Sequence, residues 1–93
     1  MRLNVKYPVR RIGDENLIII PLREVTGIKK VLSINSTSLW LIESLAGRNF
    51  NVGDISSLLK GRFDVDDLVA DFDASVWVNQ LIKYGIVGND EDA

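Results

Sequence analysis

Few residues in this 93-residue chain have side chains that could carry out bond chemistry. The sequence contains no histidine and no cysteine, which removes the commonest general base, the thiolate nucleophile and the usual zinc ligands. Carboxylates remain, but Asp64-Val65-Asp66-Asp67 lacks the glycine and glutamate spacing of an EF-hand calcium loop. The glycines form neither GxxxxGK[ST] nor GxGxxG, so no phosphate-binding loop is indicated. We therefore expect a non-catalytic protein without a metal or cofactor; the enzymatic alternative is a hydrolase that uses carboxylates alone.

The charged residues are divided unevenly along the chain. Residues 1–30 carry seven Lys/Arg and three Asp/Glu, whereas residues 64–93 carry eight Asp/Glu and a single base, Lys83. Five of these acids fall within residues 64–73, at the start of a predicted helix. Because a recognition helix in a DNA groove lies between rows of phosphates, this acidic helix argues against nucleic-acid binding. Binding through the basic strands is the alternative, and solubility alone would also account for the asymmetry.

The sequence shows no signal for export or for membrane insertion. The N-terminal segment Met1-Arg2-Leu3-Asn4-Val5-Lys6 lacks the apolar core of a signal peptide. The longest apolar run, Leu17-Ile18-Ile19-Ile20, is far shorter than the ~20 residues that cross a bilayer. The absence of cysteine fits a reducing compartment, so we expect a cytoplasmic protein.

The first third of the chain has the pattern of β-strands. Three segments are apolar or alternating, at residues 7–12, 17–20 and about 29–34, with turn residues at 13–16 and a loop through Thr26 and Gly27. Pro21 cannot donate to a strand ladder, so it marks the end of the second segment. Short connections predict an antiparallel meander in which the third strand lies at an edge. The alternative is a middle strand with no free edge.

Three helices are predicted after residue 34. Asn35-Ser36-Thr37-Ser38 offers N-cap residues for a helix that Gly47 ends, and Asn51-Val52-Gly53-Asp54 resembles a capping box. A third helix starts at residues 64–67, runs to about Tyr84 and ends at Gly85. Strands followed by helices define the α+β class. We expect one domain over residues 1–88 and an acidic tail over residues 89–93.

The third predicted helix carries two apolar stripes. At about 100° per residue, one stripe comprises Ala70, Ala74, Trp77, Val78 and Leu81. The second comprises Leu68, Val69, Phe72 and Val76, and Asn79 and Lys83 continue it. One stripe is enough to dock a helix, so the second either lines a binding groove or, if the helix breaks near residues 71–73, packs on the same core.

Several short motifs follow one another in the middle and at the end of the chain. They are Leu32-Ser33-Ile34-Asn35-Ser36-Thr37, Phe50-Asn51-Val52-Gly53-Asp54-Ile55, Arg62-Phe63-Asp64-Val65, Asp73-Ala74, Trp77-Val78, Leu81 and Gly85-Ile86-Val87. In this order they resemble the PqqD family, the small peptide-chaperone proteins of pyrroloquinoline quinone biosynthesis. The resemblance covers roughly residues 9–88, although the family often has an aromatic residue at the position of Ile42. The link between Gly47 and Asn51 also looks one residue longer than usual.

The resemblance implies a winged-helix-like domain that recognises precursor peptides, known as a RiPP recognition element. It would bind the leader of a ribosomally made precursor peptide by β-strand addition and present it to a maturation enzyme, often a radical S-adenosylmethionine protein. A free strand edge would leave the protein a monomer or an edge-paired dimer. The alternative is a winged-helix protein-interaction or regulatory domain that binds no leader. The expected peptide-binding residues are Lys30, Val31, Leu32, Ser33, Phe72, Val76, Asn79 and Lys83.

Overall fold

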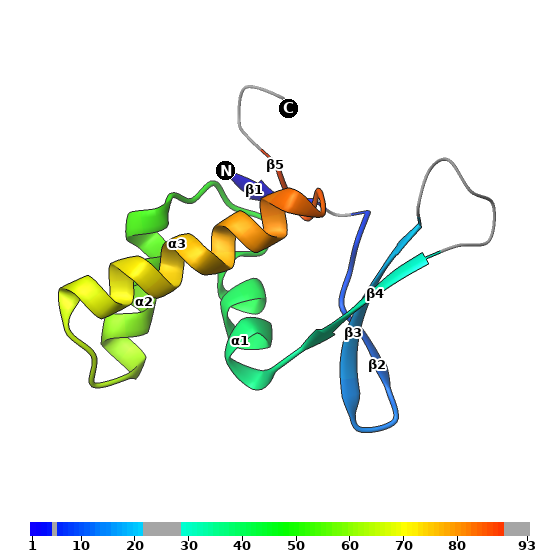
Figure 1. Ribbon diagram of the computed structural model, residues 1–93, viewed down its shortest axis with the longest axis horizontal. Helices are drawn as coiled ribbons and strands as arrows, with labels where there is room; N and C mark the ends of the chain where they lie inside the picture. The colour runs from blue at the N-terminus through cyan, green and yellow to red at the C-terminus, as the bar shows by residue number, and fades with distance from the viewer. Residues whose placement is uncertain (5, 22–28, 89–93) are drawn as a thin grey trace.

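Three antiparallel strands lead into three helices in the computed structural model, which describes residues 1–4, 6–21 and 29–88 (Figure 1). Strands β2 (Arg10–Ile12), β3 (Glu15–Pro21) and β4 (Lys29–Ile34) form one sheet in the order β2-β3-β4. This is the α+β architecture and the meander expected from the sequence. The middle-strand alternative for β4 is wrong, because β4 pairs only with β3 in the described part of the chain.

The strand pairing follows from turn chemistry and side-chain alternation. Gly13 has a φ of 62° in the tight turn between β2 and β3, a left-handed conformation that favours glycine. Strand β3 ends at Pro21, as predicted, and its alternate residues Ile18 and Ile20 are buried toward the helices. The pairing of Ile18 with Leu32 sets the register of β4. The predicted loop residues Thr26 and Gly27 lie outside the described residues, as does the predicted acidic tail.

Each helix begins at a residue whose side chain caps its first turn. The Asn35 side chain accepts a hydrogen bond from the Ser38 amide at 2.8 Å. Asn51 accepts from the Asp54 amide at 2.8 Å while its own amide donates to the Asp54 carboxylate at 2.9 Å, which completes the predicted capping box. Asp66 caps the third helix. The helices are α1 (Ser36–Leu45), α2 (Val52–Arg62) and α3 (Asp67–Lys83).

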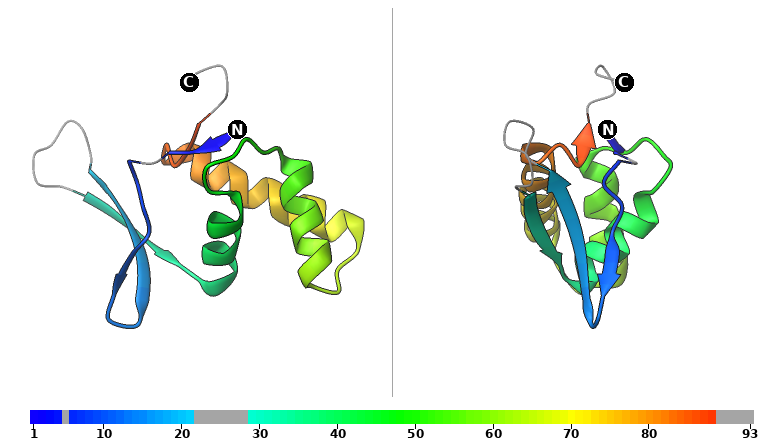
Figure 2. Two further views of the ribbon diagram at one scale, coloured as in Figure 1. Left: turned by 180° about the vertical axis from the view of Figure 1, so that it is seen from behind. Right: turned by 90° about the vertical axis from the view of Figure 1, so that its right-hand side faces the viewer.

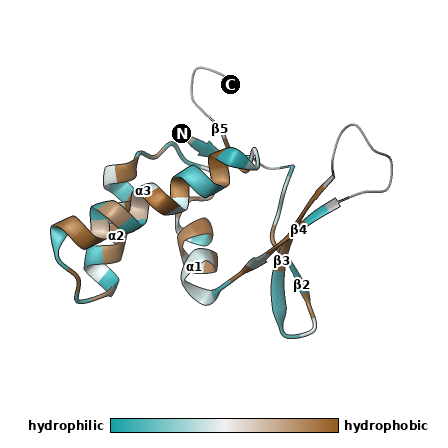
Figure 3. Ribbon diagram, in the orientation of Figure 1, coloured by the Kyte–Doolittle hydropathy of each residue, from teal (hydrophilic) through white to brown (hydrophobic). Residues whose placement is uncertain are grey.

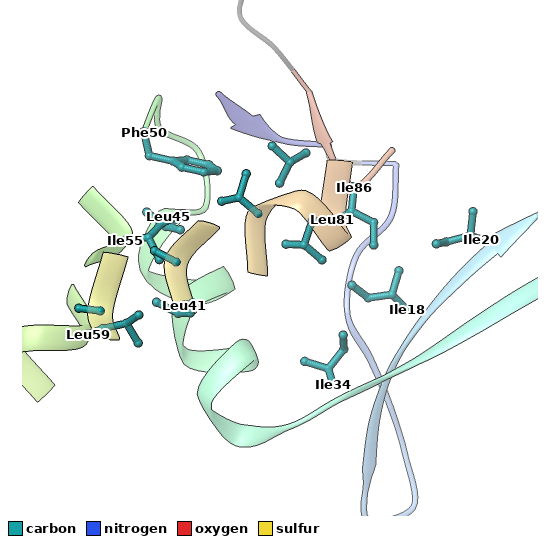
Figure 4. Close-up of a cluster of buried hydrophobic side chains, with 14 residues drawn as sticks. Ile18, Ile20, Ile34, Leu41, Leu45, Phe50, Ile55, Leu59, Leu81 and Ile86 are labelled. Carbon is teal, nitrogen blue, oxygen red and sulfur yellow. The ribbon is translucent and has the colours of Figure 1, made fainter. Parts of the chain in front are cut away.

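The hydrophobic core joins the helices to the inner face of the sheet (Figure 4). Ala70 and Ala74 are fully buried on α3, and these small side chains allow α3 to pack closely on its neighbours. The larger core residues come from every layer of the fold: Ile18, Ile20, Ile34, Leu41, Leu45, Phe50, Ile55, Leu59, Val78, Leu81, Ile86 and Val87.

A small second sheet that the sequence analysis did not predict joins the two ends of the domain. Strand β1 (Arg2–Leu3) pairs antiparallel with β5 (Val87–Gly88). The Asn4 amide donates to the Ile86 carbonyl at 2.7 Å, and the Phe50 amide donates to the Met1 carbonyl at 2.9 Å. The views in Figure 2 show this pair beside the helices, with the larger sheet extending from one end of the molecule.

Helix α3 is continuous through the acidic segment at residues 71–73, so the predicted break is wrong. The carboxylate of Asp71 accepts a hydrogen bond from the buried Ser56 hydroxyl of α2, which ties this part of α3 to its neighbour. Because α3 does not break, its second apolar stripe does not fold onto the core. Leu68 is 82% exposed and Phe72 is 69% exposed.

Candidate functional site

The edge strand β4 has an unpaired outer side within the part of the chain that the structure describes. Its side chains alternate, with Ile34 buried and Leu32 half-buried toward the core, whereas Val31 and Ser33 are exposed. Strand β4 contains no proline, so each of its residues has an amide hydrogen. An exposed edge of this kind is a template for an added strand.

A groove lies between β4 and the C-terminal half of α3. It has a volume of about 300 Å³ and is open to solvent. The strand contributes one wall, the first turn of α1 contributes Ser38, and the last turns of α3 contribute the other wall. Its lining residues are Leu32, Ser33, Ile34, Ser38, Trp77, Gln80, Leu81, Lys83 and Tyr84.

One side chain–side chain hydrogen bond fixes the wall of this groove. Trp77 Nε1 donates to Ser38 Oγ at 2.9 Å, and both residues are partly buried. A half-buried indole needs a partner for its N–H group, and this contact joins α3 to α1. The side chain of Leu81, one helical turn after Trp77, is buried in the core, which holds the same face of α3 inward.

The end of the groove near the C-terminus of α3 is cationic. Lys30 Nζ lies 5.8 Å from the centroid of the Tyr84 ring, and Lys83 Nζ lies 5.7 Å from it. These distances are within the range of cation–π attraction. No carboxylate is among the described residues that line the groove. The groove therefore combines an apolar wall with a positively charged end.

The structure divides the eight predicted peptide-binding residues into two sets. Leu32, Ser33 and Lys83 line the groove. Lys30 lies at the end of the groove, where its ammonium group is close to the ring of the lining residue Tyr84. Val31 lies on the same strand but is 52% exposed and does not line the groove. The remaining three, which are exposed on α3 and do not line the groove, are Phe72, Val76 and Asn79.

Six of the nine residues that line the groove were missed as binding residues by the sequence analysis: Ile34, Ser38, Trp77, Gln80, Leu81 and Tyr84. It assigned Trp77 to the buried stripe of α3, gave Gln80 no role and used Tyr84 only to mark the end of the helix. The indole N–H of Trp77 is the one signal that could have pointed to a position at the margin of the core, because it requires a hydrogen-bond acceptor.

The described residues form a second cavity, and they contain neither a metal-binding cluster nor a membrane-spanning helix. None of their acidic side chains forms a cluster of three or more that could hold a metal ion. No helix of the described ranges is both long and apolar enough to cross a membrane. A second cavity of about 240 Å³ is mainly apolar and lies between the N-terminal segment, β3 and α1, where Tyr7, Ile18 and Ile42 contribute to its lining.

The fold and the groove define the class of protein: a small α+β domain whose free sheet edge borders a helix-lined groove. The chain belongs to the family described as Coenzyme PQQ synthesis protein D (PqqD), whose family model matches residues 16–87. The match confirms the resemblance found in the sequence and includes β4, α1 and α3, which form the groove. Comparisons with curated proteins and with solved structures found no match.

Membership of this family supports a role in pyrroloquinoline quinone biosynthesis. Proteins of the family are non-catalytic accessory proteins that interact with partner proteins in that pathway.

Proposed function

We propose that this protein is a peptide carrier in pyrroloquinoline quinone biosynthesis. It holds the leader of a ribosomally made precursor peptide as an added strand on β4 and presents the peptide to a maturation enzyme, of the radical S-adenosylmethionine type. In this role it acts as a winged-helix-like recognition element in the cytoplasm. The observation that carries the proposal is the free edge of β4 directly beside the groove.

The added strand would obtain affinity from its backbone and selectivity from its side chains. Residues 30–34 of β4 span about 13 Å at ~3.3 Å per residue, which matches four or five residues of an extended peptide. Alternate side chains of that peptide would point into the groove, toward Leu32, Trp77 and Gln80. Lys30 and Lys83 would hold the polar end of the peptide.

A carrier of this kind positions the precursor peptide and carries out no bond chemistry itself. Holding the leader at one site raises the effective concentration of the precursor at an enzyme that binds the carrier. The same unpaired edge permits pairing of two copies through β4, which would compete with the leader for the strand. We therefore propose that the leader-bound protein is a monomer.

A pair of substitutions on α3 tests the groove against the neighbouring helix surface. Gln80 lines the groove, whereas Asn79, an exposed amide one residue earlier, does not. Gln80→Trp would fill the groove, and Asn79→Trp would add the same bulk outside it. The measurement is fluorescence anisotropy of a labelled synthetic leader from a pyrroloquinoline quinone precursor peptide.

We expect Gln80→Trp to weaken leader binding at least tenfold, since displacing one buried apolar side chain costs about 1.5–3 kcal/mol. Asn79→Trp should remain within about twofold of the unchanged protein, because exposed substitutions away from a contact usually change little. Equal loss in both variants, or no loss in a folded Gln80→Trp protein, would reject the groove.

A further inference from the structure

Helix α3 presents an apolar surface to solvent near its N-terminal end, here called the outer stripe. It consists of Leu68, Val69, Phe72 and Val76, which are 82%, 44%, 69% and 41% exposed. Leu68, Phe72 and Val76 follow one another at intervals of four residues, so they form a ridge along one side of the helix. Figure 3 shows brown, hydrophobic segments at this end of α3, far from the sheet.

Neither the core nor the groove accounts for the outer stripe. The opposite side of α3 already docks the helix through Ala70, Ala74 and Val78, which are buried. The groove uses the last turns of the helix, from Trp77 onward. From Phe72 to Gln80 the helix advances about 12 Å at ~1.5 Å per residue, so Leu68 and Phe72 lie away from the groove, whereas Val76 is four residues before Gln80 and borders the groove.

Acidic side chains lie on both sides of the outer stripe. Asp71 and Asp73 project about 100° to either side of Phe72 on the helix. No lysine or arginine occurs on α3 before Lys83. The exposed acids Asp64 and Asp66 add negative charge at the approach to the helix. An apolar ridge between carboxylates complements a surface of the opposite charge and similar apolar character.

We propose that the outer stripe is a docking surface for a basic amphipathic helix of a partner protein. The partner helix would place apolar side chains, repeating every three to four residues, against Leu68, Phe72 and Val76. Lysine or arginine beside them would face Asp71 and Asp73. A helix is the fitting occupant because α3 offers side-chain ridges and no free backbone edge.

The small size of the stripe sets the expected strength of this contact. Four side chains on one helix bury less than the ~1,000 Å² of a stable interface, so the complex should be transient. We expect a dissociation constant on the order of 10–100 μM for an isolated helix. Because Leu68 and Phe72 lie away from the groove, a partner helix centred on them would leave the β4 edge free.

A titration of the full-length, ¹⁵N-labelled chain with a defined probe tests the proposal. The probe is an 18-residue synthetic peptide of leucine and lysine with leucine at helical spacing; the control peptide replaces every lysine by glutamate. We expect amide shift changes concentrated in residues 68–76 with the first peptide, and binding at least tenfold weaker with the second. Shifts confined to the groove, spread over all acidic segments, or equal for both peptides would overturn the proposal.

Two pairs of variants test whether the peptide binds the outer stripe specifically or adheres to any exposed apolar or acidic residue. Phe72→Ser should weaken binding of the leucine–lysine peptide at least tenfold, whereas Ile12→Ser, at an apolar residue of β2 that is 56% exposed, should stay within twofold. Asp73→Lys should weaken it more than Asp14→Lys in the turn between β2 and β3. Unchanged binding of the peptide by Phe72→Ser overturns the assignment. A dimer of this chain that Phe72→Ser abolishes also overturns it, because a second copy would then cover the outer stripe.

The two proposals fail independently. Phe72→Ser leaves every residue that lines the groove in place, so leader binding should be unchanged in that variant. Loss of leader binding by Phe72→Ser in a folded protein would place the leader on the outer stripe and overturn the assignment of that stripe to a partner helix.

Discussion

The hydrogen bond from Trp77 to Ser38 holds the groove wall, and its contribution to the free energy of unfolding can be measured by substitution of both residues. Trp77→Phe removes the indole N–H and keeps an aromatic ring, and Ser38→Ala removes the acceptor. The contact is 2.9 Å long and joins residues 39 apart in sequence, on α1 and α3. Each substitution therefore removes the same tertiary contact from a different helix.

The expected magnitude follows from the partial burial of the bond. A neutral hydrogen bond of this kind contributes about 1 kcal/mol net to the free energy of unfolding. Trp77→Phe also loses packing of the larger ring, so it should cost more than Ser38→Ala. A double-mutant cycle cancels that additional cost and should leave a coupling energy of about 1 kcal/mol between the two side chains.

Urea unfolding followed by far-UV circular dichroism is the appropriate assay, since Trp77→Phe alters the fluorescence of a protein with two tryptophans. Ser38→Ala should also lower the melting temperature by about 4–8 °C for each kcal/mol lost. A coupling energy below about 0.3 kcal/mol would show that the bond does not tie α3 to α1, and would refute this account of the groove wall.

Three further substitutions test the local structure that positions the groove, each by thermal unfolding. Asn51→Ala should destabilise the protein by about 1 kcal/mol, because it removes the side chain that accepts from the Asp54 amide in the capping box; an unchanged melting temperature would contradict the cap. Gly85→Ala should cost about 1 kcal/mol, because Gly85 has a φ of 74°, whereas Gly61→Ala within α2 should stabilise by about 0.5 kcal/mol. Neither glycine has a neighbour within 4 Å of an added Cβ, so equal effects of the two substitutions would contradict the backbone argument.

The features that could be predicted from sequence are those set by neighbouring residues. The cap at Asn35 and the box from Asn51 to Asp54 depend on side chains that reach only three residues along the chain. The left-handed turns at Gly47 and Gly85 are likewise local. The edge position of β4 followed from short connections, which favour pairing of consecutive strands.

The composition of the groove could not be predicted, because it depends on how α3 is rotated against the sheet. That rotation is set by tertiary packing of Ala70 and Ala74 and by the contact of Trp77 with Ser38. The three α3 residues in these contacts are far from β4 in sequence. Sequence periodicity identified two stripes on α3. It did not show that Gln80 and Tyr84, which lie between the two stripes, would face the strand. The β1–β5 pair has two residues in each strand, too few for a periodic pattern.

The most direct test of the central claim is amide hydrogen exchange of the protein alone and with a saturating synthetic leader peptide. Strand addition predicts slower exchange of outward-facing amides within residues 30–34, since each gains a backbone partner. Exchange of residues 68–76 should be unchanged by the leader. Binding that protects residues 68–76 and leaves β4 exchanging at its original rate would contradict strand addition at the β4 edge.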